Sequence, residues 1–514
     1  MTWPAPDSQH LLLSSRAMQQ LEEALFAQGL PVAALMEQAG LGLAQAVLQH
    51  RDLKRHGLLV LVGPGHNGGD GLVVARELHL RGIDVRIWSP FNAHKPLTAE
   101  HLRYARWLGI PQLETAPDPR DPALWLDALF GLGQRRPLGP ELSQLLQERQ
   151  RSGGLIWSID GPSGLDSDSG QPTGHGTACC QRSLIVGLWK RGFWQDSAMA
   201  WVGQQQRIPL SLPSSVLPSL GEEASLGLWS SDLVSSSAPW PQPPLAATKH
   251  GRGRLRVFAG CGDYLGAARL ALEAASSSGI GWLEGVVPQP LAEQLWQVLP
   301  HVLLPNPEAP LERLDAVAYG PGLGGGALKA ELQDFPGLLL LDADGLNRLA
   351  AQGHVQLWLQ QRTGPTWLTP HAAEFERLFP ELANLPPDQA ASQAAQQSQC
   401  WVLRKGARTV IASPDGIVRQ VLQSEARAAR AGLGDVLSGY AAGLGAMGLA
   451  AGLDPMGDRF DGLLALAALA HASAGIRQSQ AGEGAASPLA IAQMLQKVQD
   501  SGSFEQAESN LMCD

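Results

Sequence analysis

The sequence predicts two α/β domains, each built around a mainly parallel β-sheet. In both halves of the chain, short apolar runs alternate with amphipathic helical patterns, which is typical of repeated strand–helix–strand units. Residues 209–250 separate the halves, and their Pro- and Ser-rich composition without periodicity indicates a linker joined to an extended segment. A length of 514 residues is sufficient for two large domains. The expected boundaries are 1–212 for the first domain, 213–224 for the linker, 225–500 for the second domain and 501–514 for a polar tail.

In the first domain, helices precede the first strand. Residues 18–28 and 31–50 carry apolar side chains at spacings of three and four, and Pro31 suits the first turn of a helix. The run LLVLV that follows predicts a buried strand at 58–62. The other expected elements are a helix at 71–81, a strand at 84–88, a helix at 101–108, and strands at 123–130 and 155–159.

The second domain restarts the same alternation after the linker. Its expected strands are 255–259, 282–287, 316–319, 338–341, 366–368, 400–403 and 409–412, with helices at 267–277 and 436–448. Residues after about 500 are polar, and we expect them to fray.

Composition excludes several classes of protein. Hydrophobic residues make up 44% and charged residues 17% of the chain, which excludes global disorder. A net charge of −10 argues against a general nucleic-acid binder. The five cysteines form no C-x-x-C pair, so a zinc site or disulfide scaffold is not expected and a reducing cytoplasm fits. The chain opens without a signal-peptide pattern, and its longest apolar stretch, 463–472, is too short to span a bilayer, so we expect a soluble protein without a membrane partner.

Three polar, glycine-containing segments follow predicted strands of the first domain: GPGHNGGDG at 63–71, DALFGLGQRRP at 127–137 and SIDGPSGLD at 158–166. Glycine lets backbone N–H groups approach a phosphate closely, and a helix N-terminus adds partial positive charge. Asp160 ends a buried strand, where ligands bind in open α/β sheets, and is placed for proton transfer. The clustered oxygen donors suit a weakly held monovalent cation. Taken singly, each segment has a structural alternative: a tight turn at 63–71, an element-ending loop with a solvated Asp at 127–137, and a capped turn at 158–166.

These three segments, with LMEQAG at 35–40, resemble the fingerprints of NAD(P)HX epimerase domains. The resemblance covers residues 10–212 and implies a Rossmann-like three-layer domain that binds hydrated nicotinamide nucleotide. It implies K⁺ held by Asn67, Asp127 and Ser163, and Asp160 as the catalytic residue that moves protons at C6. The implied substrate contacts are His66, Asn67, Gly68, Gly69, Asp70, Gly131, Leu132, Gly133, Gln134, Arg135, Arg136, Pro137 and Asp160.

Two positions depart from that family's pattern. His66 stands where the family has the first Asn of an Asn-Asn pair, which can change substrate affinity. The family's Lys-Pro-Gly is Lys190-Arg191-Gly192 here, so no role is assigned to Lys190.

The second domain has its own glycine-rich loops after strands, GCGDYLGAA at 260–268 and GPGLG at 320–324. The segment AGLGDVLSG at 431–439 opens a helix, where backbone N–H groups can hold a phosphoryl oxyanion and Asp435 can face an attacking hydroxyl. Asp342 and Asp344 end a strand and can bind substrate hydroxyls or position magnesium, although a capping role suits Asp344 equally. His371 alone is more typical of packing or capping than of catalysis.

These pieces, with TPH at 369–371 and KGARTVI at 405–411, resemble the ribokinase-like superfamily and, within it, ADP- or ATP-dependent NAD(P)H-hydrate dehydratases over residues 225–500. The resemblance implies a ribokinase-like α/β domain with Asp435 as the catalytic base that helps to phosphorylate the C6 hydroxyl before phosphate is eliminated. It implies ADP, or otherwise ATP, as co-substrate, with Mg²⁺. The implied hydrate contacts are Ala267, Gly322, His371 and Asp435, and the implied nucleotide contacts are Lys405, Gly406, Ala407, Arg408, Thr409 and Gly434.

Departures are more numerous in this half. HAAE at 371–374 replaces His-Pro-Gly-Glu, Cys261 and Leu265 replace Ser and Pro, and Leu433 replaces Thr or Ser. The segment EARAAR at 425–430 replaces the family's approach to the anion site; its arginines can add charge to a phosphate site or lie solvated.

Together the two halves predict a bifunctional metabolite-repair enzyme, with small molecules as partners and a homo-oligomeric assembly. Epimerisation would let a stereospecific dehydratase consume both C6 epimers. Two alternatives remain: a ribokinase-like small-molecule kinase with an accessory N-terminal domain, and a nucleotide-binding sensor whose altered loops bind without turnover.

Overall fold

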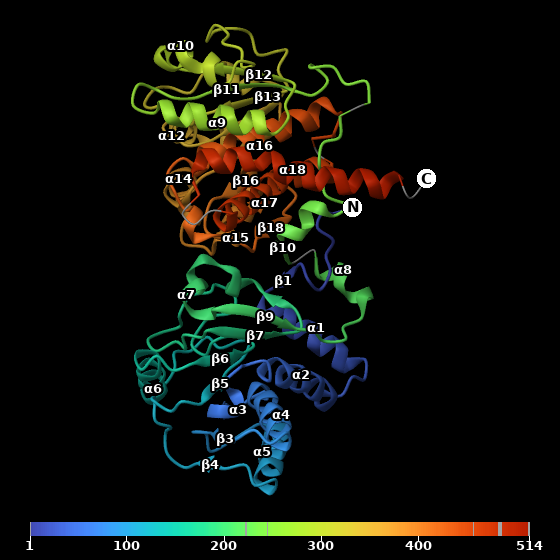
Figure 1. The fold of residues 1–514 in the computed structure, drawn as a ribbon, viewed down its shortest axis with the longest axis vertical. Coiled ribbons are helices and arrows are strands. Elements are labelled where there is room, and N and C mark those ends of the chain that lie inside the picture. The colour runs from blue at the N-terminus through green and yellow to red at the C-terminus, as the bar shows by residue number, and fades with distance from the viewer. Residues whose placement is uncertain (1, 222–223, 244, 456, 482–485, 512–514) are drawn as a thin grey trace. The chain divides into compact units, whose positions relative to one another are not determined.

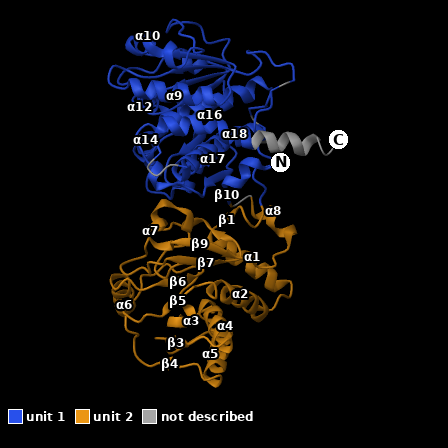
Figure 2. Ribbon diagram, in the orientation of Figure 1, with its two compact units in different colours: residues 1–6, 225–514 blue, residues 7–224 orange. Residues whose placement is uncertain are grey.

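The computed structural model describes residues 2–511 except 222–223, 244, 456 and 482–485 (Figure 1). It divides into two compact units, one formed by residues 7–224 and the other by residues 1–6 with 225–514 (Figure 2). Each unit is a three-layer α/β arrangement, as the sequence predicts.

The unit of residues 7–224 contains a seven-stranded sheet in the order β4-β3-β2-β5-β6-β7-β9, with every neighbouring pair parallel. Its elements are β1 (Leu11–Leu13), α1 (Ser15–Ala27), α2 (Val32–Val47), α3 (Leu53–His56), β2 (Leu58–Val62), α4 (His66–Leu80), β3 (Val85–Trp88), α5 (Pro96–Trp107), β4 (Gln112–Leu113), β5 (Leu124–Ala128), α6 (Pro140–Arg151), β6 (Ile156–Ile159), β7 (Arg182–Val186), β8 (Trp189–Lys190), α7 (Met199–Val202), β9 (Gln204–Ile208) and α8 (Leu217–Leu220).

Both faces of this sheet are buried because successive strand residues point to opposite sides. In β2, Leu58, Val60 and Val62 pack with α2, α4 and α5, whereas Leu59 and Leu61 pack with α6. The chain builds outward from β2 to β3 and β4, then returns to β5 on the other side of β2. The point where strand order reverses, between β2 and β5, is where ligands bind in sheets of this type.

The unit of residues 1–6 and 225–514 orders its strands β12-β11-β13-β14-β15-β16-β17-β18-β10. Neighbours are parallel except where β17 pairs antiparallel with β16 and β18. Its elements are β10 (Ser225–Leu228), β11 (Arg254–Phe258), α9 (Leu265–Ser277), β12 (Trp282–Val286), α10 (Gln289–Val298), β13 (Ala316–Tyr319), α11 (Glu331–Asp334), β14 (Leu338–Leu341), α12 (Asp344–Ala350), α13 (Val355–Gln360), β15 (Thr366–Leu368), α14 (Ala372–Leu378), α15 (Pro387–Ser398), β16 (Trp401–Arg404), β17 (Val410–Ala412), β18 (Val418–Val421), α16 (Leu433–Ala450), α17 (Asp458–Ala481) and α18 (Pro488–Leu511).

One face of this second sheet packs against α9, α16, α17 and α18, and the other against α11 to α15. Figure 1 shows α9, α16 and α18 side by side over the sheet. Helices α9 and α16 approach closely: a Cβ added at Gly439 would lie only 2.0 Å from the carbonyl oxygen of Ala271. The strand order reverses at β11, between β12 and β13, so a second crevice is expected there.

The sequence places most of these elements correctly, and β2, β13, β14 and β15 have the predicted bounds. It places several helix starts too late, those of α4 and α5 by five residues. Helix α4 begins at His66 rather than residue 71, so HNGGD forms its first turn, and α5 begins at Pro96 because proline is accommodated in the first turn. Strands β7, β9, β10 and β18 are not predicted; β9, QQQRI, is too polar to be recognised as a strand at the edge of the sheet.

The chain between the two predicted domains is more ordered than a linker. Residues 214–216 form a 3₁₀ turn that continues into α8, where Leu217 is buried, and residues 222–223 of the expected linker lie outside the described residues. The polar end of the chain is helical as far as Leu511 instead of frayed, and residues 512–514 are outside the description. The first six residues, expected in the first domain, group with residues 225–514: Trp3 is buried in that core and its carbonyl accepts from Arg419 Nε at 2.6 Å.

Among the described helices, none is long and apolar enough to cross a membrane.

Candidate active sites

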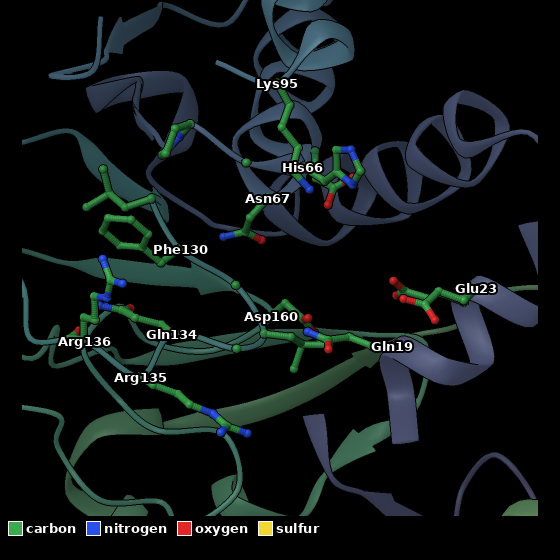
Figure 3. A pocket seen from close by; sticks show the side chains of 18 of the residues that line it. Gln19, Glu23, His66, Asn67, Lys95, Phe130, Gln134, Arg135, Arg136 and Asp160 are labelled. Carbon is green, nitrogen blue, oxygen red and sulfur yellow. The ribbon is translucent and has the colours of Figure 1, made fainter. Parts of the chain in front are cut away.

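A cavity of about 750 Å³ opens at the β2/β5 switch point of the unit of residues 7–224 (Figure 3). Its walls come from the segments after β2, β5 and β6 and from one face of α1. This volume lies in the range of small-molecule and cofactor sites. The lining residues are Gln19, Glu22, Glu23, Phe26, Pro64, Gly65, His66, Asn67, Asp70, Lys95, Leu129, Phe130, Gly131, Leu132, Gly133, Gln134, Arg135, Arg136 and Asp160.

Most substrate-binding residues expected from the sequence line this cavity, but Gly68, Gly69 and Pro137 do not. Gly68 faces the β2–α4 turn, where an added Cβ would lie 2.2 Å from the carbonyl oxygen of Gly63. Gly69 faces the end of the Met36 side chain on α2. These two glycines allow close packing around the first turn of α4, which is a structural requirement at both positions.

We expect Gly68→Ala to destabilise the unit of residues 7–224 by about 1–3 kcal/mol, because the new methyl group would overlap backbone that cannot move away freely. Thermal melting followed by circular dichroism measures the effect. Gly65→Ala is the matched control, since nothing lies within 4 Å of a Cβ added there. Equal melting temperatures for the two variants would show that the turn accommodates the methyl group.

Asp160 lies at the carboxyl end of β6 and is held by an ion pair. Its Oδ1 is 2.7 Å from Lys190 Nζ, and the Lys190 side chain is only 1% exposed. The same oxygen accepts from the backbone N–H of Val186 at 3.2 Å. Asp160 has a positive φ of 57°, a conformation that is costly for most residues and concentrates at functional sites. Lys190, to which the sequence assigned no role, therefore fixes the orientation of the expected catalytic carboxylate.

Three further carboxyl groups, those of Glu22, Glu23 and Asp70, line the cavity with Asp160, and two of them have raised pKa values. Burial raises the pKa of Glu22, and the Asp160 charge raises it further. Burial raises the pKa of Asp70 well above its usual value, and the charges of Asp160 and Glu22 act in the same direction. A proton is therefore retained more readily by Glu22 and Asp70 than by ordinary surface carboxyl groups.

The sequence analysis missed the contribution of α1 to this cavity. Its lining residues Gln19, Glu22, Glu23 and Phe26 recur at spacings of three, one and three, which places them on one face of a helix. That face carries two carboxylates and could have been found as a polar stripe on an amphipathic helix.

Positive groups lie on opposite sides of the cavity. Figure 3 shows Lys95 on one side and Arg135 and Arg136 on the other. Burial lowers the pKa of His66, and the charge of Lys95 lowers it further, which favours a neutral imidazole. The cavity thus combines separated cationic groups with a carboxylate cluster, a distribution suited to a ligand that carries phosphate at its periphery and a reactive centre inside.

The three residues expected to hold a monovalent cation lie around the segment that follows β5. Ser163 donates from Oγ to Asp127 Oδ1 at 2.7 Å, and Ser163 Oγ accepts from the Phe130 N–H at 3.2 Å. Asn67 packs against Gly131, and no partner for its buried amide nitrogen occurs within the described chain. Burial raises the pKa of Asp127, against the opposing effect of hydrogen bonds from Ser163 and the Leu129 N–H, and no described cationic side chain pairs with its carboxylate. A cation here would supply the missing positive charge.

In the other unit, the loops after β11 and β13 meet at the switch point. The Gly260 N–H donates to the Pro321 carbonyl at 2.8 Å. Gly322 has φ 63°, and a Cβ added to it would lie 2.9 Å from the Cβ of Ala267. The structure therefore brings together Ala267 and Gly322, two of the expected hydrate contacts.

Asp344 serves this loop structurally. Its Oδ2 accepts from the Gly324 N–H at 2.7 Å, and this hydrogen bond connects the loop after β13 to the start of α12. The helix-capping role considered for Asp344 from the sequence is not observed, because Ala343 is the N-cap of α12 and no side chain caps the helix.

A second group of expected residues lies where β14 and β16 end and α16 begins. Lys405 Nζ pairs with Asp342 Oδ1, and a Cβ added at Gly434 would lie 3.1 Å from that ammonium. Burial and then the charges of Asp342 and Asp344 raise the pKa of Asp435 to about 7, against the opposing effect of Lys405. Asp435 therefore changes protonation state near neutral pH, which suits a general base.

The remaining expected residues have mixed surroundings. His371 caps α14: its Nδ1 accepts from the Ala373 and Glu374 N–H groups, and its side chain is 53% exposed. Thr409 Oγ1 donates to the Gly406 carbonyl and closes the turn after β16, whereas the Arg408 guanidinium donates to the Leu422 carbonyl. His371 thus has the capping role that its isolation in the sequence indicated.

The altered segment at 425–430 does not supply a free arginine at position 427. Glu425 accepts from Arg427 through its side chain, which lowers the pKa of Glu425 to about 2. Both groups lie at the surface, so the pair is solvated and its charges largely cancel.

Comparison with known proteins bears on both units. Residues 32–192 match the family described as YjeF-related protein N-terminus, and residues 255–497 match the NAD(P)H-hydrate dehydratase family. A protein of Gloeobacter violaceus named bifunctional NAD(P)H-hydrate repair enzyme is 42% identical over 448 residues, which cover 83% of this chain and 87% of that protein. The chain belongs to the bifunctional NAD(P)H-hydrate repair enzyme family.

Other members of this repair enzyme family match nearly end to end. A Synechocystis protein of the same name is 39% identical over 487 residues, 91% of each chain. Among solved structures, a ribokinase-like superfamily protein of Enterococcus faecalis has a TM-score of 0.46 at 21% identity and covers 55% of this chain and 95% of its own. An ADP/ATP-dependent NAD(P)H-hydrate dehydratase of Bacillus subtilis, co-crystallised with ATP and Mg²⁺, has a TM-score of 0.42 at 24% identity, covering 52% of this chain and 96% of its own.

Proposed function

We propose that the chain repairs hydrated NADH and NADPH in two steps. The unit of residues 7–224 interconverts the R and S forms at C6, and the unit of residues 225–514 dehydrates the S form at the expense of ADP. The observation that carries the proposal is the match of 91% of the chain to a relative named for NAD(P)H-hydrate repair. The cavity at the β2/β5 switch point is of a size suited to a nucleotide ligand.

For epimerisation, Asp160 moves the proton at the reacting centre. The Lys190 ion pair holds the carboxylate in one orientation, which general acid–base catalysis requires. Glu22 and Asp70, whose pKa values are raised, lie on the same cavity and are suited to supply or receive a proton. Lys95, Arg135 and Arg136 lie where they can bind the phosphates of the nucleotide.

For dehydration, Asp435 accepts the proton of the C6 hydroxyl group. At the same time, the oxygen of that hydroxyl group attacks the terminal phosphorus of the nucleotide. With ADP as donor, the bond to AMP breaks. The phosphorylated hydrate then loses phosphate from C6 and a ring proton, which restores the reduced nicotinamide. Ala267, Gly322 and His371 bind the hydrate, and Lys405–Thr409 with Gly434 bind the nucleotide.

K⁺ fits the oxygen donors of Asn67, Asp127 and Ser163. Asp127 is fully buried and lacks a described cationic partner, so an ion of single positive charge would offset the cost of keeping it ionised. When bound, K⁺ supplies positive charge and fixes the loop after β5 beside the substrate.

We expect KCl to raise the melting temperature of the epimerase unit relative to tetramethylammonium chloride at equal ionic strength. A ligand present at about 100 times its Kd stabilises the folded state by about 2.7 kcal/mol. Asn67→Ala is expected to abolish the difference while costing little stability in tetramethylammonium, since the Asn67 amide nitrogen lacks a described partner. A potassium effect of the same size in this variant would exclude Asn67 from the ion's ligands.

Mg²⁺ is proposed to arrive with the nucleotide. Among the described residues, no group of three His, Cys, Asp or Glu side chains could hold a metal ion. Asp342 pairs with Lys405 and Asp344 binds a backbone N–H, so both carboxylates are engaged. Mg²⁺ commonly keeps its waters and binds through substrate phosphates, which suits this arrangement.

Cytoplasmic location, a homo-oligomeric state and the absence of a nucleic-acid partner also belong to the proposal. The described cysteines are all free, consistent with a reducing compartment, and the net charge of −10 disfavours nucleic acid. Tyr104 and Trp107 stack on α5 with ring centroids 5.7 Å apart, and Trp107 is 77% exposed, which suits a contact between copies. Light scattering of the purified protein measures the oligomeric state.

The decisive test of function is a spectrophotometric assay on mixed hydrate epimers with ADP or ATP added separately. Recovery of the full absorbance of reduced nicotinamide, with release of phosphate, is expected. A stable phosphoester product would instead favour a small-molecule kinase. Nucleotide binding without product would favour a sensor and would contradict the repair activity.

A further inference from the structure

The Lys405 ammonium lies in a largely buried position, which is unusual for a cation. Lys405 directly follows β16, and its ammonium pairs with Asp342, which directly follows β14. The Asp342 side chain is 1% exposed and that of Lys405 is 19% exposed, so the pair is shielded from water on most sides. The geometry thus fixes a positive charge at the carboxyl edge of the sheet.

The same ammonium lies against the N-terminus of α16. A Cβ added at Gly434, in the first turn, would lie 3.1 Å from Lys405 Nζ and 3.9 Å from Asp342 Oδ2. The N-cap residue Gly432, directly before the helix, has the left-handed conformation, and no side chain caps the first N–H groups of the helix. Helix N-termini carry partial positive charge. A cation beside a helix N-terminus is therefore unfavourable unless anions lie close to both. Asp342 supplies one such anion, and a phosphoryl group would be the second.

A contribution to stability alone does not explain why the charges of Asp342 and Lys405 are buried. The desolvation cost of a buried pair commonly equals or exceeds its Coulomb attraction, so such pairs contribute little to stability by themselves. Asp342 is also held by its backbone, which donates to the Tyr319 carbonyl and accepts from the Gly345 N–H at 2.8 Å. The local chain conformation therefore does not depend on the carboxylate, which leaves the carboxylate free for a different role.

We propose that Asp342 is a positioning residue that holds the Lys405 ammonium at the N-terminus of α16, where the ammonium neutralises the phosphoryl group during its transfer. This inference rests on the proposed dehydratase function and assigns Lys405 to the transfer step as well as to nucleotide binding. Charge that develops on the transferred group is stabilised best by groups fixed before the reaction. Loss of Asp342 should then lower kcat much more than it changes either KM.

The test is Asp342→Asn in the full chain, assayed for dehydration with saturating nucleotide and hydrate. We expect kcat to fall by about 10-fold to 100-fold, because small misplacements of a catalytic group have effects of this size, with each KM changed less than about threefold. The acid limb of the kcat profile should also move to lower pH, since the negative charge of Asp342 raises the pKa of Asp435. This shift reports the charge of Asp342 beside Asp435, whereas the fall in kcat at nearly unchanged KM is the result that a residue with only a structural role would not produce.

Two further variants keep the test decisive. Lys405→Met should lose kcat at least as strongly, Lys405→Arg should recover part of it, and adding Asp342→Asn to Lys405→Met should cause little further loss. If Asp342→Asn does not fold, the Lys405→Met and Lys405→Arg variants test the proposal. A role of Lys405 in the transfer step requires that kcat falls by more than either KM changes. Asp315→Asn is the matched control: its carboxylate accepts from the Arg254 N–H at the opposite edge of the sheet, so kcat should be unchanged.

Different results separate this inference from the proposed function. An active wild-type enzyme whose Asp342→Asn variant keeps its kcat, or loses only nucleotide affinity, overturns the positioning role alone. A wild-type protein that dehydrates no hydrate with ADP or ATP overturns the proposed function, and the positioning role with it.

Discussion

Asp435→Asn is expected to lower the rate of hydrate dehydration by at least about 1,000-fold while nucleotide binding is largely preserved. Asparagine has nearly the same shape as aspartate but cannot accept the proton of the C6 hydroxyl, and general base catalysis contributes about 10²–10⁴-fold. The measurement is the initial rate of absorbance recovery on the S hydrate, with nucleotide affinity determined separately by calorimetry.

The wild-type pH profile should identify the same group. Burial and the charges of Asp342 and Asp344 raise the pKa of Asp435 to about 7. The base must be ionised to act, so kcat is expected to rise with pH through about 7 and then level off. A profile that is flat from pH 5 to pH 9 would contradict Asp435 as the base.

Folding is not expected to limit this experiment. The pKa of Asp435 is higher in the folded state than in the unfolded chain, so ionisation lowers the free energy of unfolding as pH rises through about 7. Asparagine removes that cost, and at pH 8 the variant should be at least as stable as wild type. A variant that keeps full activity would exclude Asp435, and a variant that binds no nucleotide would indicate a wider disruption of the α16 N-terminus.

Periodicity was enough to predict most strands of both sheets, including β12 at one edge, but not the edge strands β4 and β9 or β10. Central strands such as β2 and β14 are apolar on both faces, so their residues are unmistakable in the sequence. Edge and near-edge strands such as β9 and β10 carry polar or small residues, and only pairing with a neighbour identifies them. The placement of Trp3 in the core of the other unit depends on long-range packing that no local pattern encodes.

The site residues show a similar division. Residues in glycine-rich loops after strands could be predicted, because the carboxyl ends of parallel strands meet at one edge and Asn67, Gly131 and Asp160 therefore converge. Lys190 and Glu22 were missed for different reasons. Lys190 lies in a segment that departs from the family's pattern, and the polar face of α1 that carries Glu22 is a periodic signal outside the glycine-rich loops. Gly68 and Gly69 lie within a motif but serve packing, which only the distances to their neighbours reveal.

Asp160→Asn is expected to lower the rate of interconversion of the R and S hydrates by about 1,000-fold, because the variant cannot move a proton at the reacting centre. The two activities of the chain make this visible in one assay. On mixed epimers with ADP, wild type should restore the reduced nicotinamide completely, whereas the variant should stop once the S form is consumed. The same solution without protein gives the background interconversion.

Asparagine is the appropriate replacement at position 160 for two reasons. The backbone there has φ 57°, which asparagine adopts more readily than most residues, so the local strain should be the same in the variant and the wild type. The amide oxygen can still accept from Lys190, whose ammonium also donates to the Val186 carbonyl at 2.6 Å. The buried cation therefore keeps partners, and a rate loss without a fall in melting temperature would report chemistry rather than folding.

A matched control lies six residues further along the same segment. Asp166 accepts from the Asp168 and Ser169 N–H groups and is not part of the cavity wall, so Asp166→Asn should leave interconversion near the wild-type rate. Normal interconversion by Asp160→Asn would remove Asp160 from the proton transfer and direct attention to Glu22 and Asp70, the cavity carboxyl groups with raised pKa values. Equal losses in both variants would indicate that the segment, and not the Asp160 carboxylate, limits the rate.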